Sequence, residues 1–387
     1  MSKVHKRTVV FAMNSPSSVG GMWERVARLY DRVAGLLQER GVSSIIAYPE
    51  LSPDPAFSPN HMEMCAANLR ALSSANMPEV KSFIEDHKVG CIVYADMRLR
   101  SLGAWRLRRL GVKTVNCCHW GPTESEKPPL WKRIAKAAIG WFDFCHYDLY
   151  VAVSKHQYYY LTSWVGVPRR RVTLSVNGID VKRFSPGSAP APEEYGLPRT
   201  TYYALTVCKA RREKRLDFLI DVAAELFKRC PDISLTFVYV GDGVCRAEWE
   251  EKARSLGLSD RFCFLGHIRD ITPLFRLVTL ALLASSREGF GLVTAEAMSC
   301  EVPVICSDLP ACREIVSHRE TGYLLPLDDL DTWVRHISKL LDSEEDRVRM
   351  GRLGRKRVEE FFSLNRQAGE FCQIVCEQLA LLDHRGY

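Results

Sequence analysis

Short apolar runs alternate along the chain with longer stretches in which apolar residues recur every three or four positions. The short runs are typical of strands buried on both faces, and the longer pattern is typical of amphipathic helices. In the first half this pattern predicts helices at 22–39 and 156–164, and strands at 8–13, 43–48, 91–95, 113–118 and 149–153. Strands that alternate with helices predict a parallel sheet with both faces covered.

A break follows at 185–200, SPGSAPAPEEYGLPRT, whose Pro, Gly, Ser and Ala predict a linker. The alternation then restarts, with helices expected at 216–228 and 247–255 and strands at 203–207, 234–240, 262–265, 280–284 and 302–306. A long amphipathic pattern covers 364–382. The fold class is therefore α/β, with two doubly wound, Rossmann-like domains of similar size. Ligands bind outside the carboxyl ends of the strands in such sheets, so we expect the chemistry in a cleft between the domains.

The composition is that of an ordinary globular protein, with 387 residues, 47% of them hydrophobic and 26% charged. No uncharged apolar run approaches the roughly 18 residues of a membrane span. The apolar run at 8–13 is also too short for a signal peptide. The fourteen cysteines form no CxxC pair and no zinc-like spacing. We therefore expect free, mostly buried thiols, no metal site and a cytoplasmic protein.

The positive charge is concentrated in the first half of the chain. Residues 1–190 contain 26 basic and 15 acidic side chains, whereas the remainder contains 27 and 31. Such an excess favours an anionic partner, either a membrane surface or a phosphorylated substrate, or it reflects solvated helix faces. No nucleic-acid-binding module is recognisable, so nucleic acid is the least favoured partner.

The segment 130–144, LWKRIAKAAIGWFDF, bears on the membrane hypothesis. It places Trp131, Trp141 and Phe142 on one helical face and puts Lys132 and Lys136 mostly off that face. A basic amphipathic helix with aromatic residues can lie in a bilayer interface. A helix packed on a sheet gives the same pattern and is the favoured interpretation.

The segment 285–299, SSREGFGLVTAEAMS, carries the strongest candidate chemistry. Glu288 precedes a glycine-rich turn, Gly289-Phe290-Gly291, and a helix is expected to begin near Leu292 and to carry Glu296. Backbone N–H groups at such a turn and helix N-terminus can bind a diphosphate. The two carboxylates can accept hydrogen bonds from hydroxyl groups of a sugar or a ribose.

With this motif in place, the chain resembles glycosyltransferase family 4, and the resemblance extends over nearly its whole length. It rests on the order of several motifs: Gly20-Gly21 followed by Glu24-Arg25, DLYVAVS at 148–154, NGID at 177–180 with Phe184 and Pro186, GDG at 241–243, FLG at 264–266, E-x7-E at Glu288 and Glu296, VPVI at 302–305 and ETGYLL at 320–325.

The resemblance implies the GT-B fold, in which two Rossmann-like domains face each other across a cleft and a C-terminal helix returns to the first. We accordingly expect an acceptor-binding domain at 1–184 with the helix at about 364–387. A nucleotide-sugar-binding domain is expected at 185–363.

The resemblance also implies roles for single residues in donor binding. Glu288 is expected to contact the donor sugar and Glu296 the ribose. The turn from Gly289 to Leu292 lines the sugar and the diphosphate, through the amides of Phe290, Gly291 and Leu292. Backbone near His267 and Ile268 is expected to contact the base.

A basic loop, CKARREKR at 208–215, corresponds to the stretch with which the family neutralises the diphosphate. Lys209 stands where the family usually has Arg, and Lys214 matches the family's Lys. Arg215 replaces a usual Gly. Lysine keeps the charge but loses the bidentate fork of arginine, so Arg211 or Arg212 can share the role.

Two sites in the first half complete the implied active site. His119 stands where the family places a histidine near the donor sugar. Gly20 and Gly21 are expected to approach the diphosphate or the acceptor. The spacing from these glycines to Glu24 is one residue longer than usual.

The family implies transfer with retention of anomeric configuration and without a metal or other cofactor. Lys209, Lys214 and the helix N-terminus would meet the charge that develops on the leaving diphosphate. The sequence Asp329-Leu330-Asp331 is formally a DxD metal motif of another glycosyltransferase fold. Here an acidic first helical turn is the favoured interpretation.

The expected activity is sugar transfer from a UDP- or GDP-sugar donor to a lipid-linked or cell-surface glycan precursor held by the basic domain. That placement would be cytoplasmic, or peripheral on the cytosolic face of a membrane. A small soluble acceptor is the alternative. A nucleotide-sugar epimerase, a phosphorylase or a non-catalytic nucleotide-sugar binder of the same fold is less favoured.

Overall fold

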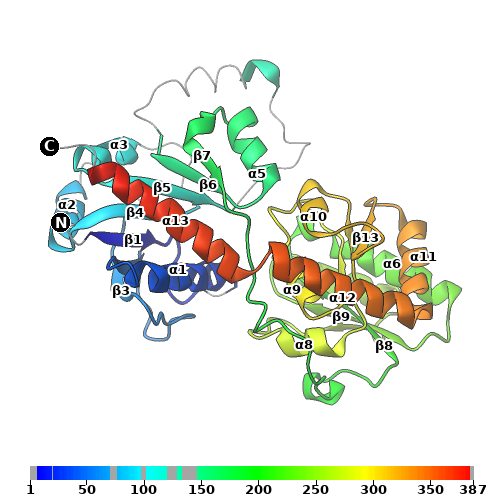
Figure 1. Ribbon diagram of the computed structural model, residues 1–387. Helices are drawn as coiled ribbons and strands as arrows, with labels where there is room; N and C mark the ends of the chain where they lie inside the picture. The colour runs from blue at the N-terminus through cyan, green and yellow to red at the C-terminus, as the bar shows by residue number, and fades with distance from the viewer. Residues whose placement is uncertain are drawn as a thin grey trace. The chain divides into compact units, whose positions relative to one another are not determined.

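The computed structural model describes residues 7–19, 21–69, 76–96, 102–119, 129–132 and 146–383. The chain divides into two compact units, residues 1–177 with 364–387, and residues 178–363. Each unit contains one parallel sheet with helices on both faces, as the strand–helix alternation predicts (Figure 1).

The sheet of the first unit has seven described strands in the order β3-β2-β1-β4-β5-β6-β7, and all neighbouring strands are parallel. From β1 the chain proceeds to β2 and β3 on one side, whereas β4 lies on the other side of β1. The strand order therefore reverses between β1 and β4. The strands are β1 Thr8–Ala12, β2 Ser43–Tyr48, β3 Glu63–Ala66, β4 Val89–Ala95, β5 Lys113–Cys118, β6 Leu149–Ala152 and β7 Val172–Leu174.

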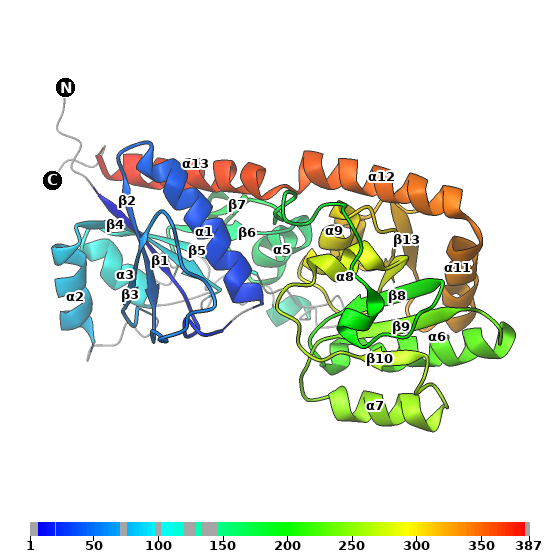
Figure 2. The ribbon, with the colours of Figure 1, turned by 90° about the horizontal axis from the view of Figure 1, so that it is seen from below.

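Helices cover both faces of this sheet. On one face α1 and α13 pack together (Figure 2). Tyr30 of α1 stacks on Phe11, with ring centroids 4.5 Å apart, and contacts Phe371 of α13. The other face is covered by apolar residues of α2 and α3, including Ile84 and Leu107. The helices are α1 Met22–Gln38, α2 Met77–Asp86, α3 Leu102–Arg109, α5 Lys155–Tyr159 and α13 Leu364–Asp383, with a π-helical turn at Tyr160–Trp164 and a 3₁₀ turn at Arg169–Arg171.

The sheet of the second unit has six strands in the order β10-β9-β8-β11-β12-β13, again all parallel. Its strand order reverses between β8 and β11. The strands are β8 Tyr202–Val207, β9 Leu235–Val240, β10 Phe262–Phe264, β11 Leu280–Leu283, β12 Val304–Ser307 and β13 Gly322–Leu325.

The apolar sides of the surrounding helices form the core of this unit, centred on Trp333, Leu219 and Phe237. Its helices are α6 Leu216–Arg229, α7 Arg246–Ser255, α8 Thr272–Leu277, α9 Leu292–Ser299, α10 Pro310–Ile315, α11 Leu330–Asp342 and α12 Glu344–Phe361, with 3₁₀ turns at Pro192–Tyr195 and Arg212–Lys214. On α12, Arg355 donates to the carbonyl of Ser299 at the end of α9 (2.6 Å), and Arg357 donates to that of Ile315 at the end of α10 (2.6 Å). These cationic caps fix the ends of both helices.

The α/β class and the central strands are confirmed, but three short strands were missed. These are β3 and β7 of the first unit and β13 of the second, of three or four residues each. The segment from Gly178 to Phe184, expected with the first domain, belongs to the second unit. There the carbonyl of Phe184 accepts a 2.6 Å hydrogen bond from Ser299, and its ring packs on Phe275.

The cysteines within the described ranges are all free, and most of them are buried. None of the described helices combines the length and apolar character that crossing a bilayer requires. Most of the segment 130–144 lies outside the described residues. Of its described part, Leu130 and Trp131 are exposed.

Candidate functional site

The carboxyl edge of the second sheet brings together the loops that follow β8, β9 and β10. The N–H of Gly241, after β9, donates to the carbonyl of Gly266, after β10, at 2.8 Å. The N–H of Ala210, after β8, donates to the carbonyl of Asp242 at 2.9 Å. Gly241 has φ 151°, and a Cβ there would lie 1.9 Å from the carbonyl oxygen of Cys208. Only glycine allows the two loops to approach this closely.

The basic loop after β8 is tied to the loop after β11, where the strand order reverses. The Nζ of Lys214 donates to Oε1 of Glu288 at 2.6 Å. The N–H of Ser286 donates to the carbonyl of Glu213 at 2.8 Å, and its hydroxyl donates to the same oxygen at 3.2 Å. The structure therefore brings together two of the predicted residues, Lys214 and Glu288, that are 74 positions apart in the chain.

Glu288 is held from a second direction by Ser285, whose hydroxyl donates to the same Oε1 at 2.7 Å. The Ser285 side chain is fully buried, and the side chains of Glu288 and Lys214 are 11% and 20% exposed. Burial alone would lower the pKa of Lys214, but the charge and hydrogen bond of Glu288 outweigh it, so the pKa is raised. Lys214 therefore remains a cation beside a carboxylate.

Two thiols, that of the half-buried Cys208 and that of the buried Cys312, interact electrostatically with this ion pair. Burial raises the pKa of Cys208 to about 12, with Lys214 opposing and Glu288 adding to the shift. A hydrogen bond with Cys306, together with burial, holds the pKa of Cys312 well above its usual range. Both thiols stay protonated at neutral pH, so they add no charge to the site.

The start of α9 and the turn before it carry backbone N–H groups that have no hydrogen-bond acceptor among the described residues. Gly291 is its N-cap, with φ 95°, and the N–H of Thr294 donates to its carbonyl at 3.0 Å. Within the described residues, the N–H groups of Phe290, Gly291 and Leu292 make no backbone hydrogen bond. Free N–H groups at the positive end of a helix form an anion site.

The other residues predicted to bind the donor differ in how exposed they are to solvent. Lys209 and His267 are exposed, and Ile268 is half-buried beside the loop at Gly266. Gly289 is half-buried in the turn, and Phe290 is buried against Phe362, with ring centroids 5.7 Å apart. Glu296 lies in α9 and is fully buried.

At Arg215 the chain has a left-handed backbone conformation, with φ 47°, in a position where the resemblance implies glycine. The guanidinium forms hydrogen bonds with Asp217 at 3.2 Å and Asp328 at 2.7 Å. The side chain therefore leads toward the loop before α11 and does not join the Lys214–Glu288 pair.

The carboxyl edge of the first sheet carries a second polar cluster where its strand order reverses. Asn14, after β1, donates its side-chain amide to the carbonyl of Asp96, after β4, at 3.3 Å. The Oδ1 of Asp96 accepts the backbone N–H of His119, after β5, at 3.2 Å. Burial lowers the pKa of His119, and the charge of Asp96 opposes that shift. The His119 Nε2 is buried with no hydrogen-bond partner among the described residues.

Of the two predicted glycines in the first unit, Gly20 lies outside the described residues. Gly21 is the N-cap of α1, with φ 67° and open space around its Cβ position.

Sequence reasoning missed Ser285, Asn14 and Asp96. Each follows a buried strand by one or two positions, which is the placement that marks ligand-binding positions in doubly wound sheets. This placement is a signal in the sequence that could have found all three residues.

The DxD sequence has a structural role in the described chain. The Oδ1 of Asp329 caps α11 by accepting the N–H of Thr332 at 3.1 Å, and Asp331 pairs with Arg229. The helix-start interpretation is confirmed. Within the described ranges, no three His, Cys, Asp or Glu side chains cluster as ligands for a metal ion.

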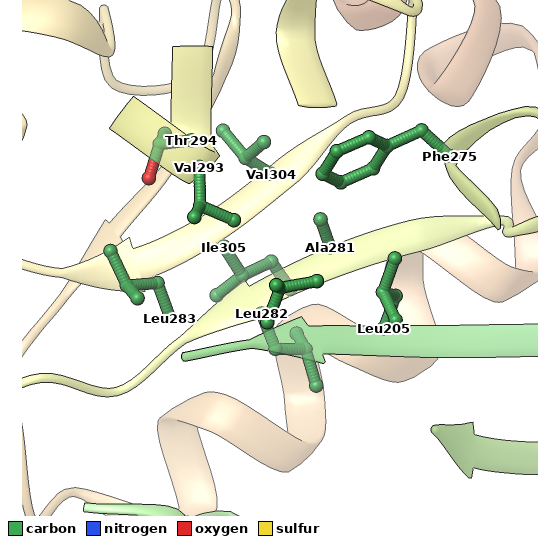
Figure 3. A pocket seen from close by; sticks show the side chains of 10 residues that line it. Leu205, Phe275, Ala281, Leu282, Leu283, Val293, Thr294, Val304 and Ile305 are labelled. Atoms are coloured by element: carbon green, nitrogen blue, oxygen red, sulfur yellow. The ribbon is translucent and has the colours of Figure 1, made fainter. Parts of the chain in front are cut away.

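A separate apolar pocket lies inside the second unit (Figure 3). Leu205, Ala281 and Ile305 line it from the strands, and Phe275 and Val293 line it from the helices. Apart from Thr294, its lining side chains are hydrocarbon, so the pocket is a packing gap beneath α9. It has no groups that would recognise a sugar or a phosphate.

Two family models together match most of the chain. The model described as "Glycosyltransferase Family 4" matches residues 24–183, and the model "Glycosyl transferases group 1" matches residues 189–357. The boundary between the two matches falls close to the linker predicted at 185–200.

Curated relatives are similar over part of their length. The chain is 30% identical over 188 residues to the "Putative glycosyltransferase EpsD" of Bacillus subtilis, covering 48% of this chain and 49% of that protein. It is 28% identical over 233 residues to the N-acetyl-alpha-D-glucosaminyl L-malate synthase of Bacillus anthracis, covering 60% of each. The chain thus spans about half the length of the curated relatives it matches.

Solved structures are similar over nearly the whole chain. A glycosyltransferase from Rickettsia africae superposes with a TM-score of 0.78 and 16% identity, covering 97% of this chain and 99% of that one. Anabaena HepE in complex with UDP and glucose superposes with a TM-score of 0.72 and 17% identity, covering 96% and 100%. At these identities the likeness establishes the shared fold.

Proposed function

Because the chain belongs to glycosyltransferase family 4 and has the GT-B fold, we propose that it transfers a sugar from a nucleotide-diphosphate donor to an acceptor. The observation that carries this proposal is the donor-type constellation in the second unit. Lys214, Glu288 and the unfilled N–H groups before α9 lie at the point where the strand order reverses, which is where doubly wound sheets bind nucleotides.

In this proposal the N–H groups of Phe290, Gly291 and Leu292 bind the diphosphate, and Glu288 accepts hydrogen bonds from the donor sugar. Lys214 stays charged beside Glu288, so it can stabilise the negative charge that develops on the leaving diphosphate. Lys209 is exposed and free to swing toward the phosphates. Glu296 is assigned to the ribose, and backbone near His267 and Ile268 to the base.

The stereochemistry follows from the family. We propose retention of the anomeric configuration, with the leaving phosphate oxygen taking the proton of the attacking acceptor hydroxyl. We also propose that the reaction needs no metal, because Lys214 and the start of α9 supply the positive charge that a cation would otherwise provide.

The acceptor is assigned to the first unit, whose polar cluster includes His119. The excess of basic residues at 1–190 favours an anionic acceptor, such as a lipid-linked glycan precursor at a membrane surface. The HepE structure named above contains UDP and glucose, which supports a UDP-sugar as the first donor to test.

The competing functions share this fold and are weighed by the residues of the site. The E-x7-E arrangement of Glu288 and Glu296 is typical of the transferase and less so of an epimerase or a phosphorylase. Glu288 and Lys214 are both present and in contact, which argues against a decayed, non-catalytic binder.

The first experiment is a thermal-shift screen of the protein with UDP, GDP, ADP and their sugars, with and without magnesium. A ligand that binds only the folded state at 100 times its Kd adds about 2.7 kcal/mol of stability. We expect one nucleotide to raise Tm, equally well with EDTA as with magnesium. No shift with any nucleotide would contradict the proposed donor site.

Glu288→Gln then separates an enzyme from a binder. We expect turnover of the bound nucleotide sugar to fall by roughly 10²–10³-fold while binding of the free nucleotide persists. Arg335→Gln, a change on the exposed part of α11, is the matched control and should retain activity. Unchanged turnover in Glu288→Gln would favour a different reaction or a different site.

A further inference from the structure

The Glu288 carboxylate is held asymmetrically. Its Oε1 accepts two short hydrogen bonds, from Lys214 Nζ at 2.6 Å and from Ser285 Oγ at 2.7 Å. Its Oε2 accepts none from the described residues. A carboxylate oxygen has two lone pairs, so these two donors saturate Oε1 and leave Oε2 as the acceptor for a ligand.

We propose that Ser285 is a positioning residue of the donor site, which together with Lys214 holds Oε1 of Glu288 so that Oε2 faces the hydroxyl groups of the donor sugar. The inference rests on the proposed function and adds to it the residue that sets the orientation of the carboxylate.

Ser285 is suited to this task in a way that Lys214 is not. Its side chain is fully buried and has one rotatable bond, and it lies two positions after the end of β11. Lys214 has a flexible four-carbon stem, and its remaining N–H groups are needed by the diphosphate. When the donor draws Lys214 toward its phosphates, Ser285 is the contact that keeps Glu288 in place.

The neighbouring serine provides a matched comparison. Ser286 has the same side chain, but its hydroxyl donates to the carbonyl of Glu213 at 3.2 Å and not to Glu288. Removing either hydroxyl deletes one oxygen atom, but only removal of Ser285 changes the surroundings of the carboxylate. Ser286→Ala therefore controls for the loss of a serine hydroxyl from this loop.

The inference predicts an effect that depends on the sugar. A nucleoside diphosphate without a sugar makes no use of Oε2, so its affinity should not depend on Ser285. A nucleotide sugar does use Oε2. A hydrogen bond to a charged group contributes about 1.5–3 kcal/mol, so its loss should weaken nucleotide-sugar binding by roughly 10–100-fold.

The test measures Kd by calorimetry for UDP, GDP and their glucose and mannose conjugates, with wild type, Ser285→Ala and Ser286→Ala. We expect Ser285→Ala to bind the free nucleotide within about twofold of wild type and the nucleotide sugar roughly 10–100-fold more weakly. Ser286→Ala should stay within about twofold for both ligands. In a Glu288→Gln background, Ser285→Ala should add less than about threefold, because it acts through that carboxylate.

Three results would overturn the inference. Equal weakening of nucleotide and nucleotide sugar in Ser285→Ala would make Ser285 a structural residue. No change for either ligand would make it dispensable. A wild type that binds no nucleotide would remove the proposed function and this inference with it, whereas the first two results leave the proposed function intact.

Discussion

The two sheets place polar groups at the same topological position but build them in different ways. In the second unit, the reversal between β8 and β11 carries Glu288, whose Oε1 accepts short hydrogen bonds from the side chains of Lys214 and Ser285. In the first unit, the reversal between β1 and β4 carries Asn14 and Asp96, joined mainly through backbone groups, and His119 keeps a buried nitrogen without a described partner.

This difference shows what each edge is prepared to bind. A carboxylate held by two short side-chain hydrogen bonds is oriented before its ligand arrives, which suits a ligand that must be held in one geometry. At the first edge only the backbone N–H of His119 is held by Asp96, and the buried Nε2 of His119 suits a ligand that supplies its missing partner. If the second edge is the more rigid of the two, substitutions there should cost more than matched substitutions in the first.

The largest expected effect on the free energy of unfolding comes from replacing one glycine in each unit by alanine. Gly241→Ala places a Cβ 1.9 Å from the Cys208 carbonyl oxygen and should cost about 3 kcal/mol or more. Gly21→Ala meets open space but places a side chain at φ 67° and ψ −121°, so it should cost about 1–3 kcal/mol. Urea unfolding followed by hydrogen exchange of β1 and β9 measures each unit separately. Equal losses in both variants would mean that the loops after β8 and β9 rearrange easily.

A smaller effect is expected from pH. The pKa of His119 is lowered below 6.5 by burial, so as the pH falls the unfolded chain takes up a proton at His119 before the folded chain does. The free energy of unfolding therefore has its full value above about pH 6.5. Below that pH it decreases by at most about 1.4 kcal/mol per pH unit. His119→Gln should remove this acid sensitivity from the first unit, measured as Tm between pH 7.5 and 5.

The second unit offers a control for this pH prediction. Burial and the charges of Arg319 and His336 lower the pKa of His318, whose Nδ1 accepts the N–H of Leu324 at 3.0 Å. Because His318 is exposed, His318→Gln should change the acid sensitivity less than His119→Gln does. The opposite order would place the main acid-sensitive group in the second unit.

The smallest effect is expected at Arg215. Arg215→Gly relieves a left-handed backbone but removes the hydrogen bonds to Asp217 and Asp328, and these partly exposed pairs contribute little. The free energy of unfolding should change by less than about 1 kcal/mol. Nucleotide affinity should stay within about twofold, because the side chain leads away from Glu288. A tenfold loss would place Arg215 at the phosphates.

The sequence predicted the carboxyl edge of the second sheet better than that of the first, for physical reasons. From Leu280 to Glu296 the chain is one short strand–turn–helix unit, so its geometry follows from local residues such as Gly291. The bond from Lys214 to Glu288 joins positions 74 apart, and only strand order brings them together. Pattern reasoning gave the strands but not which strands are neighbours.

The first edge depends on features with weak local signals. Asp96 is a single acidic residue after a strand, and only the pairing of β4 with β1 and β5 makes it the partner of Asn14 and His119. The short strands β3 and β7 were missed because three or four half-buried residues give no clear period. The positions of most strands could be predicted from the sequence, but which strands pair with each other could not.

The helix α13 has a consequence for how the protein is made. Phe371 and Cys372 of this helix complete the apolar layer over Phe11 and Tyr30, although all of residues 178–363 are synthesised in between. On the ribosome, the second unit is a continuous segment that can fold as soon as it emerges, whereas the first must wait with only α1 covering that side of its sheet until α13 is made. The earlier half of the nascent chain is therefore the later to mature, and part of its apolar layer stays exposed during translation.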